Sequence, residues 1–271
     1  MKRLQQRYRY SLILLRQLVI TDFKVRYQGS VLGYVWTLLR PLALFLILYI
    51  VFAKFLGVGD SVPYFPVYLL LGIVLWNYFV EVTTGGVASI VSSGDLIRKI
   101  NFPKYVIILA GSFSALINLC INLVVIAGFM FFLDVPIQAD ILLLPLIIAQ
   151  LFILALAMAF LLSATYVKAR DVNYIWEVVL QAGFYATPIL YPIALVVEKN
   201  EAAAKLLMLN PMAQIIQDAR FVTVTEQTQV IGTMFGAGNI WRLVPYGITL
   251  FSIIVAAHYF RKRSKFFAEE V

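Results

Sequence analysis

Charge, cysteine and histidine are all scarce in this sequence. Only 13% of the residues are charged, against about 25% in an average soluble domain, whereas 62% are hydrophobic. A single Cys and a single His leave little for a disulfide framework or for a metal site built from these residues. The composition therefore indicates an integral membrane protein rather than a soluble enzyme or a disulfide-rich secreted domain.

Sequence motifs of enzymes are missing as well. There is no GxxxxGK[ST] loop to hold the phosphates of ATP, and no GxSxG, HExxH or CxxC motif. Acidic residues, which proton-coupled transport usually needs within the membrane, are limited to Glu81 and Glu177 near the ends of apolar runs. We therefore predict no catalytic residue, no metal and no cofactor on this chain, and an energy source on another protein.

Long apolar runs dominate what is present. A helix needs about 20 apolar residues to cross a bilayer, and six runs are candidates. They are residues 32–56, 64–84, 105–133, 140–167, 174–197 and 241–260. No soluble domain boundary separates them. We predict one all-α membrane domain over residues 1–271, with six transmembrane helices across 32–260 and a cytoplasmic tail at 261–271.

The distribution of Lys and Arg predicts the orientation of these helices. With the N-terminus in the cytoplasm, 16 of the 22 basic residues fall on the cytoplasmic side and four outside. Cytoplasmic loops of membrane proteins carry such an excess, so we expect both termini in the cytoplasm. The net charge of +8 then faces anionic lipids of the inner leaflet, which argues against nucleic acid as a partner.

Residues 1–31 form a basic, amphipathic segment. Leu4, Tyr8, Leu12 and Leu15 recur at helical spacing, with arginines between them. A cleaved signal peptide would have a short basic start and then an apolar core, which this segment lacks. We predict an interface helix on the membrane surface. It serves either as an anchor or as a collar that positions a cytoplasmic partner.

The fifth apolar run is interrupted. Residues 174–186 give only about 20 Å of helix at 1.5 Å per residue, and Pro188 and Pro192 then break the backbone hydrogen bonds. Because broken backbone at membrane depth must be covered by protein or water, we predict a re-entrant fifth span. Residues 198–211 and 212–221 read as two short amphipathic helices on the outer face, either surface decoration or gate helices.

The loop at residues 85–104 is small, basic and half-apolar. Val87 and Ile90 begin one apolar edge, Gly94 allows a bend, and Pro103 ends the segment before the third span. An ordinary cytoplasmic loop would explain the charges alone, but two apolar edges favour a helix that docks an ATPase. The residues predicted to couple to this ATPase are Asp95, Leu96, Ile97, Arg98, Lys99 and Ile100.

Four stretches carry a resemblance to a known family. They are "TDFKVRYQGSVLGYVWTLLRPL" (21–42), "GDLIRKINFPKYV" (94–106), "ATPILYP" (186–192) and "NPMAQIIQDAR" (210–220). With the six-span layout, they resemble the membrane subunit of ABC-2 type exporters of the polysaccharide class, the O-antigen and teichoic acid permeases. The first two stretches are quite specific in combination, and the others are weaker alone.

This resemblance implies partners that the composition does not reveal. It implies a homodimer in the cytoplasmic (inner) membrane and two copies of a separate ATPase subunit, which would hold ATP and Mg. It also implies that a lipid-linked glycan is moved outward. Two other functions stay open at this point: an ABC-2 exporter of a small lipid or drug, and a membrane transferase acting on lipid-linked sugar.

Aromatic side chains suit such a glycan substrate, because sugar rings stack on them while a charged pore would hold the chain too tightly. Packing and membrane-interface roles are the competing explanation for each of them. The candidates for the channel lining are Tyr34, Trp36, Phe45, Tyr49, Phe52, Phe184 and Tyr185, with Tyr174 and Trp176 nearby.

Overall fold

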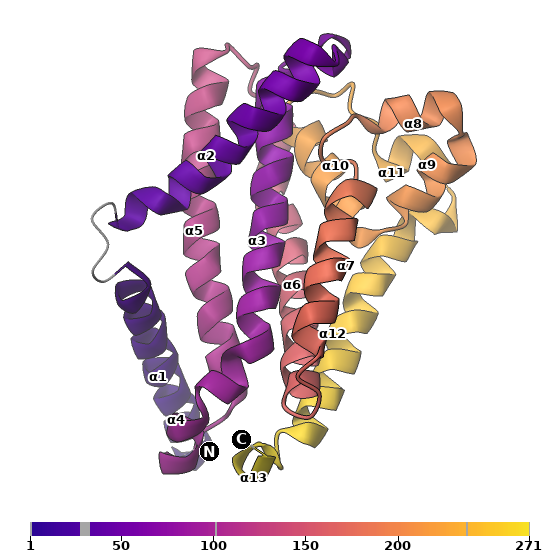
Figure 1. The fold of residues 1–271 in the computed structure, drawn as a ribbon. Coiled ribbons are helices and arrows are strands. Elements are labelled where there is room, and N and C mark those ends of the chain that lie inside the picture. Colours follow the sequence, from indigo (N-terminus) through magenta and orange to yellow (C-terminus); the bar gives the residue numbers. More distant parts are fainter. Residues whose placement is uncertain (1, 28–32, 101, 237, 271) are drawn as a thin grey trace.

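The computed structural model describes residues 2–27, 33–100, 102–236 and 238–270. Every regular element within these residues is a helix, which confirms the predicted all-α class (Figure 1). Five described segments are long and apolar enough to cross a membrane. They are Trp36–Phe55, Phe65–Ser92, Tyr105–Phe132, Ala139–Tyr166 and Ile240–Arg263.

The helices are labelled in chain order. They are α1 (Lys2–Tyr27), α2 (Trp36–Tyr49, continued by a π-helical stretch Ile50–Phe55), α3 (Phe65–Ser92), α4 (Gly94–Lys99), α5 (Tyr105–Phe132), α6 (Leu144–Tyr166), α7 (Val172–Ala186), α8 (Ile193–Lys199), α9 (Glu201–Met208), α10 (Pro211–Thr223), α11 (Ile231–Phe235), α12 (Val244–Arg263) and α13 (Phe267–Glu270). Short 3₁₀ segments, Ala139–Leu143 and Ile240–Leu243, lead into α6 and α12.

Helix α3 is the centre of the bundle. In its most apolar 18-residue window 78% of the residues are buried, against 11% for the α2 segment and 17% for the α12 segment. It packs on α5 and α6 along its length and also contacts α2, α7 and α10. At Gly86 the approach to α6 is so close that an added Cβ would lie 2.6 Å from the Cβ of Ala159, so only glycine fits.

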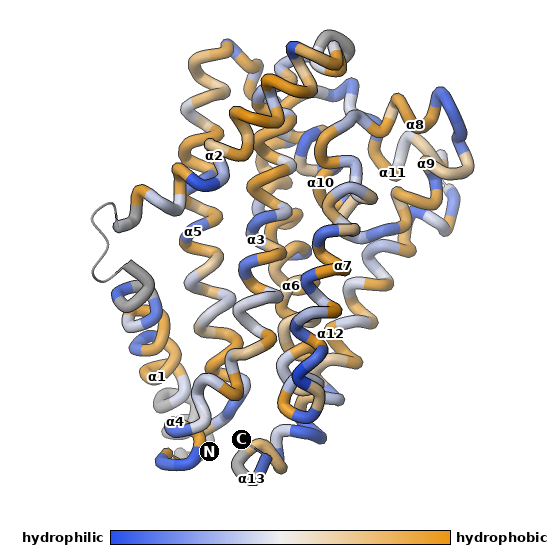
Figure 2. Tube along the Cα trace, viewed as in Figure 1, coloured by the Kyte–Doolittle hydropathy of each residue, from blue (hydrophilic) through white to orange (hydrophobic). Residues whose placement is uncertain are grey.

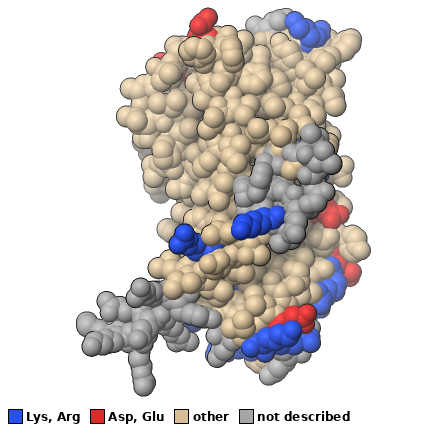
Figure 3. All heavy atoms as spheres, turned by 90° about the vertical axis from the view of Figure 1, so that its left-hand side faces the viewer, with Lys and Arg blue, Asp and Glu red and all other residues tan. Residues whose placement is uncertain are grey.

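Charged and hydrophilic residues gather at the two ends of the bundle. Both termini, α4 and α13 lie at the lower end, whereas α8 to α11 lie at the upper end (Figure 1). Apolar residues follow the long helices and hydrophilic ones concentrate at their ends and in α1 (Figure 2). The face seen in Figure 3 is almost free of charge between its top edge and the basic side chains lower down. This pattern is that of a multi-pass membrane protein.

The fifth apolar run is divided where the sequence predicts a break. Helix α7 has 15 residues, or about 22 Å at 1.5 Å per residue, which is shorter than the roughly 30 Å hydrocarbon core. Pro188 and Pro192 lie between α7 and α8, and both are buried. A re-entrant path for this segment stays a prediction, as does the count of six spans.

Two features of the fold differ from the expectation drawn from the sequence: the residue at which α3 ends and the burial of α10. Helix α3 continues to Ser92 rather than ending near residue 84, so Val87 and Ile90 are buried residues of α3 and not an edge of the docking segment. They pack within the bundle because α3 projects beyond the apolar run. Helix α10 was expected on the outer surface, but 11 of its 13 residues are buried, since it inserts between α3, α6 and α12.

Candidate transport path and coupling surface

A buried arginine joins the broken segment after α7 to the bundle. The side chain of Arg220 on α10 is fully buried. Its Nε donates to the carbonyl of Tyr68 at 2.9 Å, and its Nη1 and Nη2 donate to the carbonyls of Pro188 and Ile189, each at 2.6 Å. We call these four residues the Arg220 cluster. Because a lone buried charge is costly, these bonds determine how α10, α3 and the 187–192 turn fit together.

The neighbours of Arg220 complete its environment. The guanidinium carbon lies 3.6 Å from the centroid of the Tyr68 ring, a cation–π contact. At Gly72 an added Cβ would come 2.5 Å from the Arg220 Nη2 atom, so the absence of a side chain there makes room for the guanidinium. Gln217 donates to the Pro188 carbonyl and accepts a hydrogen bond from the Tyr68 hydroxyl.

Local sequence explains why α10 begins where it does. The Asn210 side chain accepts a hydrogen bond from the backbone N–H of Met212, and Pro211 occupies the first helical position. Both residues are favoured at these places in a helix start. Helix α9 begins in the same way, because the Asn200 side chain accepts from the N–H of Ala203. The two short helices predicted around Asn210 and Pro211 are thus present.

The predicted channel aromatics fall into different environments. Trp36 is 53% exposed and Tyr185 64% exposed, so both face away from this protomer's core. Tyr49, Phe52 and Phe184 are half-buried and pack against the core from its surface. These five residues therefore lie at or near the surface of α2 and of the end of α7.

Three other aromatic candidates are Phe45, Tyr174 and Tyr34. Phe45 is buried and packs against Phe129 of α5, with ring centroids 5.9 Å apart, so within one protomer it is a packing residue. A channel role for Phe45 stays a prediction that this burial does not favour. Tyr174 is 69% exposed on α7. The side chain of Tyr34 lies outside the described residues.

The predicted coupling residues lie at the end of the molecule that holds both termini (Figure 1). Ile97 is buried and Leu96 half-buried, whereas Asp95, Arg98 and Lys99 are exposed on α4. Ile100 is exposed and extended, so the helix ends at Lys99, one residue before the end of the predicted coupling segment. The apolar side of α4 therefore anchors it, and its charged side faces outward.

The C-terminal segment supports α4 and was missed by sequence analysis. The ring of Phe267 on α13 is fully buried and packs edge-on against Phe260, with centroids 5.4 Å apart. Lys104 donates to the carbonyl of Ser264 at 2.7 Å, and its ammonium lies 6.0 Å from the Phe267 ring. Helix α13 thereby contacts α4, so the tail is part of the same surface.

Arg220 was also missed, because a charge count treats it as an outer surface residue. A signal was present in the sequence: Gln214, Gln217 and Arg220 recur every three residues and so share one face of α10. All three are fully buried. Polar residues on one face of an otherwise apolar helix indicate a buried network rather than a solvated face.

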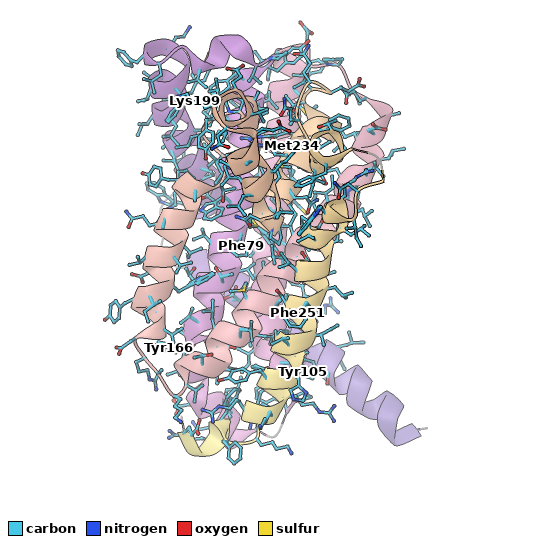
Figure 4. All side chains as sticks on the ribbon, turned by 90° about the vertical axis from the view of Figure 1, so that its right-hand side faces the viewer. Phe79, Tyr105, Tyr166, Lys199, Met234 and Phe251 are labelled. Carbon is cyan, nitrogen blue, oxygen red and sulfur yellow. The ribbon has the colours of Figure 1, made fainter. Side chains whose placement is uncertain are left out.

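Positions along the bundle agree with the predicted alternation of loops. Lys199 and Met234 lie at the end opposite Tyr166 and Tyr105 (Figure 4). The loops that follow α3 and α6 are therefore on the side of both termini, and the α8 to α11 segment is on the other side (Figure 1).

The chain also resembles known proteins. The family described as ABC-2 type transporter matches residues 13–224, from α1 to the end of α10. The chain is 30% identical over 207 residues to the O-antigen export system permease protein RfbA of Myxococcus xanthus, covering 75% of this chain and 77% of that protein. It is 28% identical over 234 residues to a protein of the same name from Klebsiella pneumoniae, covering 85% and 88% respectively.

Proposed function

Since the chain belongs to the ABC-2 type transporter family, we propose that it is the membrane-spanning subunit of an ATP-driven exporter of a lipid-linked polysaccharide. The observation that carries this proposal is the similarity to O-antigen export permeases over most of both chains. The substrate would be O-antigen, teichoic acid or a similar cell-wall glycan. It would move outward across the cytoplasmic membrane, with both termini of the chain in the cytoplasm.

ATP hydrolysis belongs to a separate ATPase subunit in this proposal, with two copies per transporter holding ATP and Mg. The chain itself acts as a permease, not an enzyme. The exposed residues Asp95, Arg98 and Lys99 of α4, together with Ile100 just after it, receive the ATPase. Because buried Ile97 fixes α4 to the bundle and α4 contacts α3 and α13, movement of the ATPase is transmitted to these helices.

A second copy of the chain completes the transport path. The α2 segment is largely unburied within one protomer, and α7 exposes Tyr174, Ile175 and Val178. Such exposed apolar faces on two helices suit an interface between copies. The glycan would pass between the two α2 and α7 faces, where Trp36 and Tyr185 offer rings on which sugars stack weakly and slide.

The direct test is the fate of lipid-linked glycan in cells depleted of this chain. We expect the glycan to accumulate on its lipid carrier at the cytoplasmic face, and re-expression to restore its appearance outside. The purified chain should retain the ATPase subunit and the glycolipid. Normal surface glycan in depleted cells, with no accumulated intermediate, would refute the proposal.

The orientation has its own test in a Cys120→Ala background. An impermeant thiol reagent added to intact cells should label Asn200→Cys, on the α8 to α11 side, and should not label Lys262→Cys at the opposite end. The reverse labelling pattern would invert the transport direction assigned to the chain.

A further inference from the structure

A cavity lies on the bundle away from the α2 and α7 faces. It has a volume of about 630 Å³ and is partly open to the surface, between α6, α10, α12 and the segment that begins α11. This volume is within the roughly 300–1,000 Å³ of typical small-molecule sites. Its apolar walls are Leu143, Leu146, Ile147, Ile153, Phe221 and Leu250.

The depth of the cavity matches one leaflet of a membrane. Its lining runs from Leu143, just before α6, to Ile153, a separation of ten residues or about 15 Å at 1.5 Å per residue. That length is half of the roughly 30 Å hydrocarbon core. Since the cavity begins at the end where α8 to α11 lie, it spans the leaflet on that side.

Arg242 and Tyr246 add polar groups to this largely apolar cavity. Arg242 lines it just before α12 begins, and a second hollow of about 520 Å³ shares Arg242 and Tyr246. Arg242 also approaches α11, because an added Cβ at Gly232 would lie 3.1 Å from its Nη2. The guanidinium thus lies beside α11 and the start of α12, at the α8 to α11 end of the bundle.

Two carboxylates accompany this arginine. Asp140 lines the cavity from an exposed position in the 3₁₀ segment before α6. Asp218 is held inside, accepting hydrogen bonds from the Tyr246 hydroxyl at 3.1 Å and from Gln214. With two acids and one base among its lining residues, the cavity disfavours a purely anionic headgroup.

We propose that this cavity binds one molecule of phosphatidylethanolamine from the membrane leaflet on the α8 to α11 side. Its phosphate contacts Arg242, its ammonium contacts Asp140, and one acyl chain lies along the apolar walls between α6 and α12. An ammonium has three N–H donors for carboxylates, whereas phosphatidylglycerol and a polyprenyl phosphate have none with positive charge. The site is separate from the proposed transport path and does not rest on the proposed function.

The test uses the full chain reconstituted in nanodiscs of phosphatidylethanolamine and phosphatidylglycerol, followed by native mass spectrometry. The wild type should retain one phosphatidylethanolamine per chain after delipidation. Ala149→Trp places an indole in the cavity from an exposed position and should reduce this retention at least ten-fold. The matched control, Ala127→Trp on an exposed part of α5, should retain the lipid as the wild type does.

Substitutions of the charged groups distinguish the headgroup contacts without altering the apolar walls. Asp140→Asn should abolish the preference for phosphatidylethanolamine over phosphatidylglycerol, and Arg242→Gln should weaken retention of both. Equal retention by the wild type and Ala149→Trp, a preference for phosphatidylglycerol, or a polyprenyl phosphate in place of phosphatidylethanolamine would each overturn the proposal.

Discussion

The two ends of this molecule are held together in different ways. At the α8 to α11 end, the Arg220 cluster joins three segments through a fully buried guanidinium and three backbone carbonyls. At the other end, α4 buries Gly94 and Ile97 and exposes Asp95, Arg98 and Lys99. Buried polar contacts therefore fix the first end, whereas the charged side chains of α4 lie at the surface of the second.

The difference shows how one kind of residue can serve opposite purposes. Arg220 and Arg98 both lie in segments that resemble polysaccharide permeases, and both are charged. Burial makes the hydrogen bonds of Arg220 hard to replace, because unsatisfied buried groups cost free energy. Arg98 lies at the surface instead, where a charge remains hydrated and its loss costs little stability.

The largest effect is expected for Arg220→Met. The change leaves three buried carbonyls without their donor, at about 1–3 kcal/mol for each unsatisfied group. We expect a strongly lowered thermal unfolding temperature in detergent and loss of export. Lys205→Met, which removes a partly exposed cation on α9, is the matched control and should unfold like the wild type. Similar unfolding temperatures for the two variants would show that the Arg220 cluster does not hold this end.

The next largest effect concerns the opposite end. Reversing Arg98 and Lys99 to Glu should leave the bundle folded, because both side chains are exposed, but should abolish copurification of the ATPase subunit. The same double reversal at Lys199 and Lys205, at the α8 to α11 end, should not affect copurification. An intact complex with normal export in the Arg98 and Lys99 variant would contradict the coupling role of α4.

A smaller effect is expected for aromatics on the proposed path. Tyr49→Ala and Tyr185→Ala each remove stacking of about 0.5–1.5 kcal/mol, by analogy with aromatic pairs. We expect glycan export to fall roughly two- to ten-fold in each variant, with ATPase assembly unchanged. Phe251→Ala, which truncates an exposed ring on α12, should export normally. Wild-type export by both Tyr variants would place the path along other helices.

The smallest effect sharpens the contrast between buried and exposed charge within the α8 to α11 end. Glu201 pairs with Lys205 one turn along α9 at 2.6 Å, and this contact lowers the pKa of Glu201. Any stabilisation is therefore present at neutral pH and is lost as the pH falls through the lowered pKa of Glu201. Because exposed pairs contribute little, Glu201→Gln should hardly change thermal unfolding at pH 7. If Glu201→Gln lowered the unfolding temperature as much as Arg220→Met does, exposed and buried charges would not differ in their effect on stability at this end.

Much of the architecture could be predicted from residue order. Five of the six apolar runs correspond to described helices of spanning length, and the break near Pro188 is where proline chemistry requires it. Helix starts at Asn200 and Asn210 follow from capping. The extension of α3 to Ser92 could not be predicted in this way, because Val87 and Ile90 are kept helical by packing beyond the apolar run.

The candidate sites were less predictable than the helices. Helical spacing placed Phe45 and Tyr49 among the same candidates, although Phe45 is buried against Phe129. Phe267 gave no signal in a short basic tail, yet its ring is fully buried. Both outcomes depend on neighbours distant in sequence, which local patterns do not specify.

The sequence by itself determined that this chain is helical, apolar enough for a membrane, and broken after Ala186, because hydrophobicity and proline act locally. Only the tertiary structure decided which apolar face is core and which is surface, since α2 and α3 are similarly apolar but differ in burial. It also decided that Arg220, which the charge count assigned to the outer side, is buried inside the bundle. This placement requires Tyr68 and the turn at Pro188 and Ile189 to meet in space, because their carbonyls replace water around the guanidinium. It also requires Gly72, whose missing side chain leaves room for Arg220.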